Sequence, residues 1–492
     1  MLSRPAAEML SYVIDDAFYY LVPAHSFAHG EGWTHDGITR TSGFQMLYGY
    51  LAAVVSRFAG LSPMLPATMA VVSTIALLAG IHLLIERGGR IYGAAIAAAA
   101  AVLVLATPNV PWQITNGLEW SWVVLATVLF VGALVGQHAW LVALAACLTI
   151  LVRLDLAVFV AVFALALAPR HARVVACAAA GGAIAVALTA LNSRVITGDW
   201  IPNSVATKQL WASTTDFLPA VTWSRLVRGT GPGFVLTELR AALSLRSFVL
   251  IGVAGAGVVA LCAREWARDS LRGRLAVASI ITITAYTLVY ARGTNVIGDH
   301  YSGTIVVPVF VLTCGFLLWA GPYWMVPAVA IGITAIALSR DTSWRAPYQR
   351  GIAEGAPSLI AQVPQGSRVA AWNAGLAGWQ TGKRVTNLDG LANAEVVPAM
   401  RTGTLACYLR DARITHIMDY GFMFAGQIDT GFSADEESRR RMLMRRNGYD
   451  AAKLYGCTTL VGSHAVAEVP SRYRLFALDS ACVAALCAVP TR

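Results

Sequence analysis

The stretch from Tyr301 to Ser339 reads YSGTIVVPVFVLTCGFLLWAGPYWMVPAVAIGITAIALS and contains no Asp, Glu, Lys or Arg. Because a membrane-spanning helix needs about 20 apolar residues, this stretch is long enough for two. The composition of the chain agrees, since 57% of its 492 residues are hydrophobic, 13% are charged and the mean hydropathy is +0.60. Soluble domains carry about 25% charged residues. The sequence therefore predicts a polytopic α-helical membrane protein.

Other apolar runs predict the remaining membrane helices of residues 1–340. Most of them approach the length of a helix that crosses a bilayer, and about 10 to 12 transmembrane helices are expected in total. The opening stretch divides into residues 301–320 and 325–339, and the further runs span residues 44–61, 65–85, 91–107, 118–135, 139–152, 156–168, 174–191, 248–262 and 275–291.

The composition changes after residue 340. Apolar runs shorten, charge increases, and segments such as SRVAAWNAGLAGWQTGKRVTNLDG (367–390) alternate between strand and helix patterns. We expect residues 341–492 to form a soluble α/β domain of ordinary size. Four of the eight cysteines lie in this segment, and if it is exported they allow three disulfide connectivities. These residues are Cys407, Cys457, Cys482 and Cys487.

The basic residues predict which loops lie in the cytoplasm. Lys and Arg accumulate in cytoplasmic loops, and the segments APRHAR (168–173) and CAREWARDSLRGR (262–274) fit this rule. The loops that carry TNGLEW, IPNSVATK and GDHY, together with residues 341–492, are then extracytoplasmic. The net charge of +10 is explained in this way. No basic stripe with interleaved aromatic residues lies in a soluble segment, so nucleic acid is not an expected partner.

The same count of helices places Asp15 in the cytoplasm, opposite the other polar motifs. We therefore expect either a re-entrant or interfacial segment near the start, or a miscounted pair of later helices. Only about a dozen residues precede the acidic pair Asp15–Asp16, which is too short to cross a bilayer. The sequence is thus expected to lack a first transmembrane helix that delivers this pair to the outer face.

Ionisable residues at the ends of membrane helices are expensive to bury and are candidates for function. Carboxylates can act as a general base or hold a metal, and cations can hold an anionic leaving group. Each group also has a structural alternative: the acidic pair can be merely solvated, Arg153 and Asp155 can pair or cap a helix break, and Lys208 can anchor its segment at the interface. The candidates are Asp15, Asp16, Glu119, Arg153, Asp155, Asn203, Lys208 and His300.

The order of these motifs resembles a known family. The segment VIDDAFYYLVPAHSFAHGEGWTHDGITRTSGF (13–44) resembles the first extracytoplasmic loop, here about residues 11–43, of GT-C superfamily membrane glycosyltransferases. The likeness is closer to the bacterial branch that includes the mycobacterial arabinofuranosyltransferases. NGLEW, VRLD, IPNSVATK and DHYSGTIVVPVF resemble later motifs of that branch in the same order, and residues 369–393 resemble its C-terminal domain.

The resemblance implies an enzyme of the cell membrane with an extracytoplasmic C-terminal domain. Its donor is a polyprenyl-phosphate sugar, and its acceptor is a cell-envelope glycan, lipid or protein. Asp15 or Asp16 deprotonates the acceptor hydroxyl or helps to bind a divalent metal such as Mg²⁺ or Mn²⁺, which stays open. The donor phosphate is expected at Lys208, assisted by Arg153 and His300. Substrate contacts are expected from Tyr19, Tyr20, Glu119, Asn203 and Asp155.

Two other functions remain compatible with the sequence. A secondary transporter also buries charges in a membrane domain, but such proteins often show internal repeats, and none is evident here. A non-catalytic scaffold or polyprenyl-carrier-binding protein with the same fold is the second alternative. The sequence identifies neither the sugar nor the acceptor.

Overall fold

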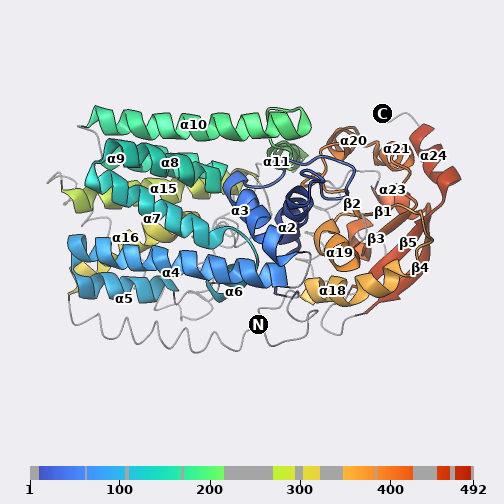
Figure 1. Cartoon of the computed structure of the whole chain (residues 1–492), viewed down its shortest axis with the longest axis horizontal. Helices are drawn as coiled ribbons and strands as arrows, with labels where there is room; N and C mark the ends of the chain where they lie inside the picture. The colour runs from blue at the N-terminus through green and yellow to red at the C-terminus, as the bar shows by residue number, and fades with distance from the viewer. Residues whose placement is uncertain are drawn as a thin grey trace.

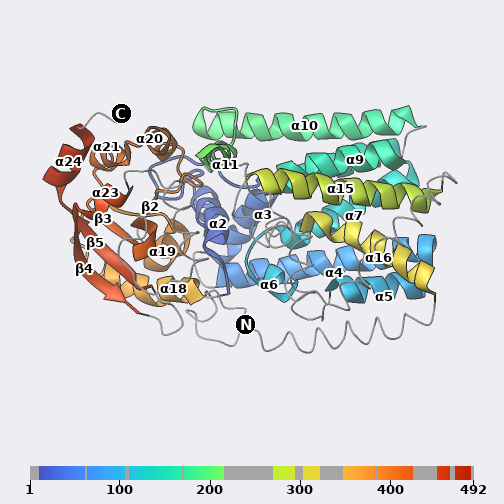
Figure 2. The ribbon, with the colours of Figure 1, turned by 180° about the vertical axis from the view of Figure 1, so that it is seen from behind.

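The structure is a computed structural model that describes residues 10, 12–60, 64–105, 110–167, 171–214, 270–293, 303–321, 347–382, 385–424, 451–465 and 471–488. A bundle of long helices occupies one end of the molecule and an α/β domain the other, with helix α2 (Asp15–Ala28) between them (Figure 1, and from behind in Figure 2). The expected helices at 248–262 and 325–339, and the candidate residue His300, lie outside the described residues.

The longer helices of the bundle coincide with the predicted apolar runs, although α4 and α10 continue six or seven residues beyond them. These longer helices are apolar on every side because both their inner and outer faces avoid water, whereas α11 is polar in composition. The described elements are α3 (Met46–Ala59), α4 (Met64–Tyr92), α5 (Ala94–Leu105), α6 (Val110–Thr115), α7 (Trp120–Gly136), α8 (Ala139–Val152), η1 (Leu154–Leu156), α9 (Ala157–Leu167), α10 (Ala172–Thr197), α11 (Asn203–Thr214), α15 (Leu271–Gly293) and α16 (Val306–Ala320).

Two of the described helices, α4 and α10, are long and apolar enough to cross a membrane by length and composition, and six others are shorter apolar helices. The bundle also exposes large apolar side chains along its outer surface, including Ile75 and Leu78 on α4 and Ile184 and Leu191 on α10. Water-soluble proteins rarely expose apolar patches of this extent. The surface therefore favours a lipid environment.

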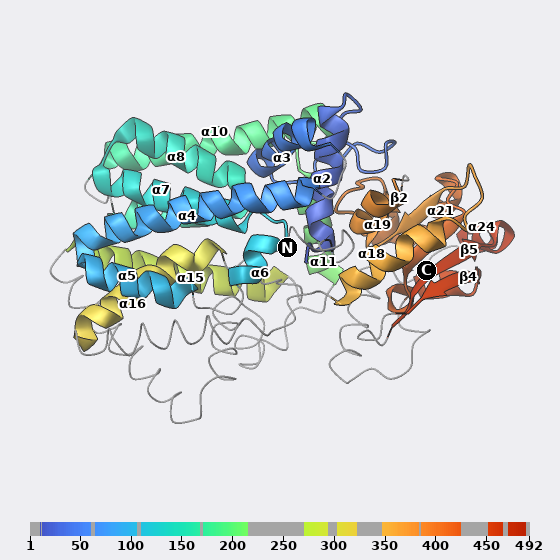
Figure 3. The same ribbon diagram turned by 60° about the horizontal axis from the view of Figure 1, so that its bottom comes forward.

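Helix α3 explains how Asp15 reaches the same end of the bundle as the other polar motifs. This helix has 14 residues and lies beside α2 at the end of the bundle nearest the α/β domain, whereas α4 runs along the bundle (Figures 1 and 3). The backbone N–H of Ile14 donates to the Asn116 carbonyl at 3.2 Å, and the Tyr48 hydroxyl donates to the Gly117 carbonyl at 2.7 Å. Helices α2 and α3 thus stay at the end that carries TNGLEW.

The α/β domain is a five-stranded mixed sheet with helices on both sides. Its strand order is β2-β1-β3-β5-β4, with β1 parallel to β2 and β3, and β5 antiparallel to β3 and β4. Figure 1 shows α18 and α19 on one side of the sheet and α21 and α24 on the other. The elements are α18 (Pro347–Ile360), β1 (Val369–Ala371), α19 (Ala374–Thr381), β2 (Val385–Asn387), α20 (Val396–Thr402), α21 (Leu405–Asp411), β3 (His416–Tyr420), η5 (Gly421–Phe424), α23 (Ala451–Tyr455), β4 (Thr458–His464), β5 (Tyr473–Leu478) and α24 (Ser480–Ala488).

A buried carboxylate holds the turn between β1 and α19. Asp419, on β3, accepts hydrogen bonds from the backbone N–H groups of Trp372 at 2.8 Å and Asn373 at 2.9 Å. It also accepts from the Asn373 side chain at 2.9 Å and from the Tyr420 backbone at 2.7 Å. Burial raises the pKa of Asp419 to about 6, against the opposing effect of these donors. The carboxylate fixes the direction in which α19 leaves the sheet.

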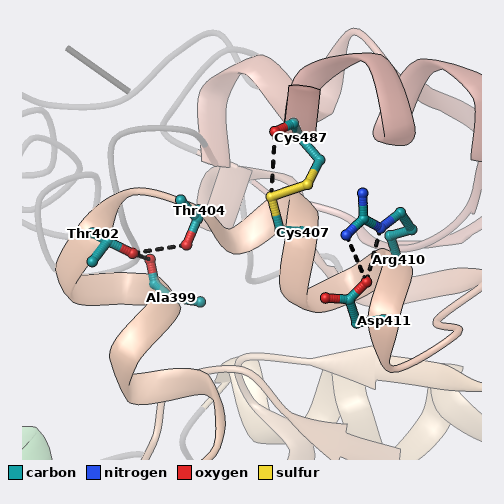
Figure 4. The surroundings of a disulfide bond; sticks show 7 residues. All are labelled: Ala399, Thr402, Thr404, Cys407, Arg410, Asp411 and Cys487. Carbon is teal, nitrogen blue, oxygen red and sulfur yellow. Dashed lines mark hydrogen bonds and ion pairs between the residues drawn. A yellow bond between two sulfur atoms is a disulfide. The ribbon is translucent and has the colours of Figure 1, made fainter. Parts of the chain in front are cut away.

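Two disulfides converge on the last helix. Cys407 on α21 pairs with Cys487 on α24 (Figure 4), and Cys457, just before β4, pairs with Cys482 on α24. Of the three connectivities that the sequence left open, the structure has this one. Helix α24 is therefore joined covalently to two separate parts of the domain, on the side of the sheet away from α18 and α19.

Replacing Asp419 with Ala should destabilise the α/β domain. The substitution leaves the backbone N–H groups of buried Trp372 and half-buried Asn373 without this acceptor, which costs about 1 to 3 kcal/mol for a fully buried group. Thermal unfolding in detergent, monitored by tryptophan fluorescence, measures the effect. Asp411→Ala is the matched control, because Asp411 is an exposed surface residue paired with Arg410. Equal unfolding temperatures for the two variants would contradict this role for Asp419.

Breaking the Cys407–Cys487 disulfide should also destabilise the domain. The bond closes a loop of 80 residues, and native disulfides contribute about 2 to 4 kcal/mol. Cys407→Ser should therefore unfold at a lower temperature than Cys177→Ser, which removes a free cysteine in α10. Mass spectrometry of unreduced peptides checks the pairing directly. A Cys407 thiol that reacts with an alkylating reagent before reduction would refute it.

Candidate active site

Helix α2 presents its two adjacent carboxylates to different neighbours. Asp15 and Asp16 occupy the first helical turn, where negative charge complements the helix dipole. Successive residues of a helix point about 100° apart, so these side chains lie on separate faces. Residues four apart share a face, which groups Asp15 with Tyr19 and Asp16 with Tyr20. One face meets the α/β domain and the other meets the bundle.

The Asp15 carboxylate lies at the N-terminus of α19. It accepts hydrogen bonds from the backbone N–H of Leu376 at 2.7 Å and of Gly375 at 3.2 Å, and the residue is 5% exposed. Burial raises its pKa to about 7, although the Leu376 N–H acts in the opposite direction; the charge of Asp16 raises it further. The backbone donors and the dipole of α19 together stabilise the ionised carboxylate.

Gly375 permits this close approach. A Cβ atom at this position would lie 2.4 Å from the Asp15 carbonyl oxygen and 3.0 Å from the Phe18 Cβ. Backbone and side chain of α2 thus fill the space that any other residue would need. Phe18 also packs its ring against Trp379 of α19, with ring centroids 5.5 Å apart. The contact between α2 and α19 therefore depends on this glycine.

Tyr19 makes a second connection to the α/β domain. Its hydroxyl donates to the Trp372 carbonyl at 2.9 Å and accepts from the Asn387 side chain at 3.1 Å. The Asp389 carboxylate lies 3.3 Å from the same hydroxyl. Trp372 follows β1, and Asn387 and Asp389 stand at the end of β2, so Tyr19 lies at the carboxyl edge of the parallel strands. The predicted sugar-contacting residue Tyr19 is thus buried inside a contact between domains.

Asp16 and Tyr20 are half-buried on the face toward the bundle. The Tyr20 ring packs edge-on against Tyr48, with centroids 5.3 Å apart, and the Tyr48 hydroxyl bonds to Gly117. This face therefore lies against α3 and the loop that leads to Glu119. The neighbouring position on the helix explains why the charge of Asp16 acts on the pKa of Asp15.

Buried Glu119 and Arg153 form an ionic cluster with half-buried Asp155. Arg153 Nε and Nη2 donate to the two oxygens of Asp155 at 3.0 and 2.8 Å, and Arg153 Nη1 lies 3.5 Å from Glu119 Oε1. Arg153 stands between α8 and α9, where the helices break at η1. Burial raises the pKa of Glu119, whereas the charges of Arg153 and Lys208 lower it. Arg153 and Asp155 thus pair with each other at a break between two helices, which is the structural alternative that the sequence offered for these residues.

Helix α11 brings Asn203 and Lys208 to this end of the bundle. Asn203 is buried; its side chain accepts from the Ser42 backbone at 2.7 Å and donates to the Leu391 carbonyl at 2.7 Å. Thr207 donates to the Gly390 carbonyl at 2.8 Å. Lys208 is half-buried and close enough to affect Glu119. Asn203 therefore joins α11 to the α/β domain, and the charge of Lys208 acts on Glu119 of the ionic cluster.

The structure separates the predicted site residues into two groups. One group makes contacts with the α/β domain and consists of Asp15, Tyr19 and Asn203. The other group lies at the end of the bundle nearest that domain and consists of Asp16, Tyr20, Glu119, Arg153, Asp155 and Lys208. Sequence reasoning missed Asp36, Asn387 and Asp389 as members of the first group. Asp36 accepts from the Thr386 hydroxyl on β2 at 3.2 Å. Asn387 and Asp389 could have been predicted from their position at the end of a strand, because functional polar side chains often lie at the carboxyl ends of parallel strands.

The surroundings of Asp15 and Asp16 bear on the divalent metal that was expected at these two residues. Within the described ranges, no three His, Cys, Asp or Glu side chains gather closely enough to hold a metal ion. Each Asp15 oxygen already accepts a backbone hydrogen bond from α19, and the residue is only 5% exposed. The arrangement of these two residues does not fit a metal site.

The chain is similar in part to known proteins. A family model described as a domain of unknown function (DUF8728) matches residues 344–476. No curated protein sequence matches the chain. Among solved structures, the Archaeoglobus fulgidus oligosaccharyltransferase in complex with zinc and sulfate is similar at 14% identity and a TM-score of 0.49, over 83% of this chain and 65% of that chain. This chain thus spans 65% of the length of that protein.

ArnT from Cupriavidus metallidurans is also similar. The form bound to undecaprenyl phosphate has 15% identity and a TM-score of 0.44, over 98% of this chain and 96% of that chain. The apo form has 16% identity and a TM-score of 0.41, over 97% and 96% of the two chains. The matched domain family covers residues 344–476, a segment that includes Leu376, Trp372 and Leu391, the partners of Asp15, Tyr19 and Asn203.

Proposed function

We propose that this chain is a membrane glycosyltransferase that moves a sugar from a polyprenyl-phosphate donor to a hydroxyl-bearing acceptor. One observation carries the proposal: an otherwise apolar bundle brings Glu119, Arg153, Asp155 and Lys208 together at the end that faces the α/β domain, where the neighbouring helix α2 carries Asp16. Such a site lies where a lipid-linked phosphate and a polar acceptor can meet. The order of the sequence motifs, which resembles GT-C glycosyltransferases, supports the same function.

Asp16 is the proposed general base. The acceptor hydroxyl oxygen attacks the anomeric carbon of the donor sugar while its proton passes to the Asp16 carboxylate. The bond between the anomeric carbon and the phosphate oxygen breaks, and the polyprenyl phosphate leaves with the electron pair. Asp15, the other residue expected in this role, has both carboxylate oxygens engaged by α19, so Asp16 is the better placed of the two.

Lys208 is the proposed partner of the departing phosphate. A positive charge at this position stabilises the negative charge that accumulates as the sugar–phosphate bond breaks. The Arg153 guanidinium is bound to Asp155 and lies near Glu119, so its role is to hold these carboxylates in place. Tyr20, Glu119 and Asp155 are proposed substrate contacts. His300 remains a proposed assistant of Lys208.

The proposed location is the cell membrane, with the α/β domain on the extracytoplasmic side. The basic loops at 168–173 and 262–274 support this orientation through the excess of Lys and Arg on the cytoplasmic side of membrane proteins. The acceptor would then be a glycan, lipid or protein of the cell envelope.

Asp16→Asn should reduce sugar transfer by about 100-fold or more, because an amide cannot accept the acceptor proton. Thermal stability should change little, since the side chain keeps its size. Transfer is measured with native membrane extract as the source of donor and acceptor. Asp199→Asn, at an exposed carboxylate that follows α10 at the same end of the bundle, serves as the control. Full activity in Asp16→Asn would reject this base.

Lys208→Ala should lower transfer and weaken the retention of polyprenyl phosphate, whereas Lys208→Arg should retain part of both because it keeps the charge. Lys453→Ala, at an exposed lysine of the α/β domain, is the matched control. Retention is measured by co-purification of radiolabelled undecaprenyl phosphate in detergent. If the Ala variant retains as much lipid phosphate as the wild type, the phosphate site lies elsewhere.

A further inference from the structure

We propose that Asp15 is a positioning residue: its carboxylate anchors α2 to the N-terminus of α19 and thereby directs Asp16 toward the bundle. The inference rests on the proposed function and assigns separate roles to two adjacent acids. It concerns a bond between segments that are 361 positions apart in the chain.

The first argument is the space around Asp15. A general base must come within about 2.6 to 3.2 Å of the atom whose proton it takes. The Leu376 and Gly375 amides lie at such distances from the two Asp15 oxygens, and only 5% of the residue is exposed. No acceptor sugar can reach the carboxylate without separating α2 from α19.

The second argument is the place of this contact in the α/β domain. In doubly wound domains, anionic ligands bind at the carboxyl edge of the parallel strands, next to the N-terminus of the helix that follows the first strand. Helix α19 follows β1 at such an edge. The Asp15 carboxylate lies at this N-terminus of α19. A side chain of the same chain therefore occupies the position at which such domains bind an anionic ligand.

The third argument is helical geometry. Asp15 and Tyr19 fix one face of α2 through Leu376, Trp372 and Asn387. Because the helix is rigid over one turn, fixing this face also fixes the face about 100° away, which carries Asp16 and Tyr20. Releasing Asp15 lets α2 rotate or shift, and a displacement of 1 Å at a reacting group can cost about 100-fold in rate.

Two substitutions at Asp15 separate anchoring from proton transfer. Asn keeps one oxygen, which can still accept the Leu376 N–H, but it cannot act as a base; Ala removes both oxygens. An anchor predicts that Asp15→Asn stays within about tenfold of wild-type transfer while Asp15→Ala falls by about 100-fold. A base predicts equal losses. At Asp16, Asn and Ala should both abolish transfer.

Amide hydrogen exchange gives a readout that does not depend on activity. In Asp15→Ala, the Gly375 and Leu376 amides of the full-length protein should exchange at least about tenfold faster, because they lose a charged acceptor. The exchange rates of these two amides should be unchanged in Asp16→Ala. Gly375→Ala, which crowds α2 from the other side, should accelerate exchange at Leu376 and lower transfer, whereas Gly456→Ala, at an exposed position, should do neither.

Equal loss of transfer in Asp15→Asn and Asp15→Ala, with unchanged exchange at Gly375 and Leu376, would overturn the inference. Faster exchange in Asp15→Ala together with the activity order Asn above Ala would establish it. If the wild type transfers no sugar from any polyprenyl-phosphate donor, the proposed function fails. Faster exchange in Asp15→Ala would then still show that Asp15 anchors α2.

Discussion

The contact between the Asp15 carboxylate and the N-terminus of α19 is the constraint on which the arrangement of the two domains depends. Burying a carboxylate is unfavourable unless hydrogen bonds replace its water, and the Leu376 and Gly375 amides do so. The pKa of about 7 shows that burial still outweighs these bonds at this residue. Tyr19 and Asn203 reinforce the contact from α2 and α11, so the α/β domain holds both helices that carry Asp16 and Lys208.

The helices of the bundle could be predicted from sequence because lipid and core both demand apolar residues. Helix α8 ends at Val152, as its apolar run does, and α4 extends seven residues past its run because Glu86, Arg87 and Arg90 continue the helix at its end. The direction of α3 could not be predicted, because a run of 14 helical residues is apolar whether it crosses the membrane or lies at its surface.

The candidate site was predictable in part. The sequence allowed the Arg153–Asp155 pair because two opposite charges two residues apart at a helix break can meet locally. It could not separate Asp15 from Asp16, since their roles depend on partners more than 350 positions away. The same holds for Asn203. From the sequence alone its amide could contact a substrate, but in the structure it bonds to Ser42 and Leu391.

The distance in sequence between Asp15 and Leu376 has a consequence for biosynthesis. At about 5 to 20 residues per second, a ribosome needs roughly 20 to 70 s to add the 361 residues that separate them. During that interval α2 has no α19 to receive its carboxylate. Helices α2 and α19 therefore meet only late in translation. In a chain that stops before the α/β domain, nothing fixes the direction of Asp16.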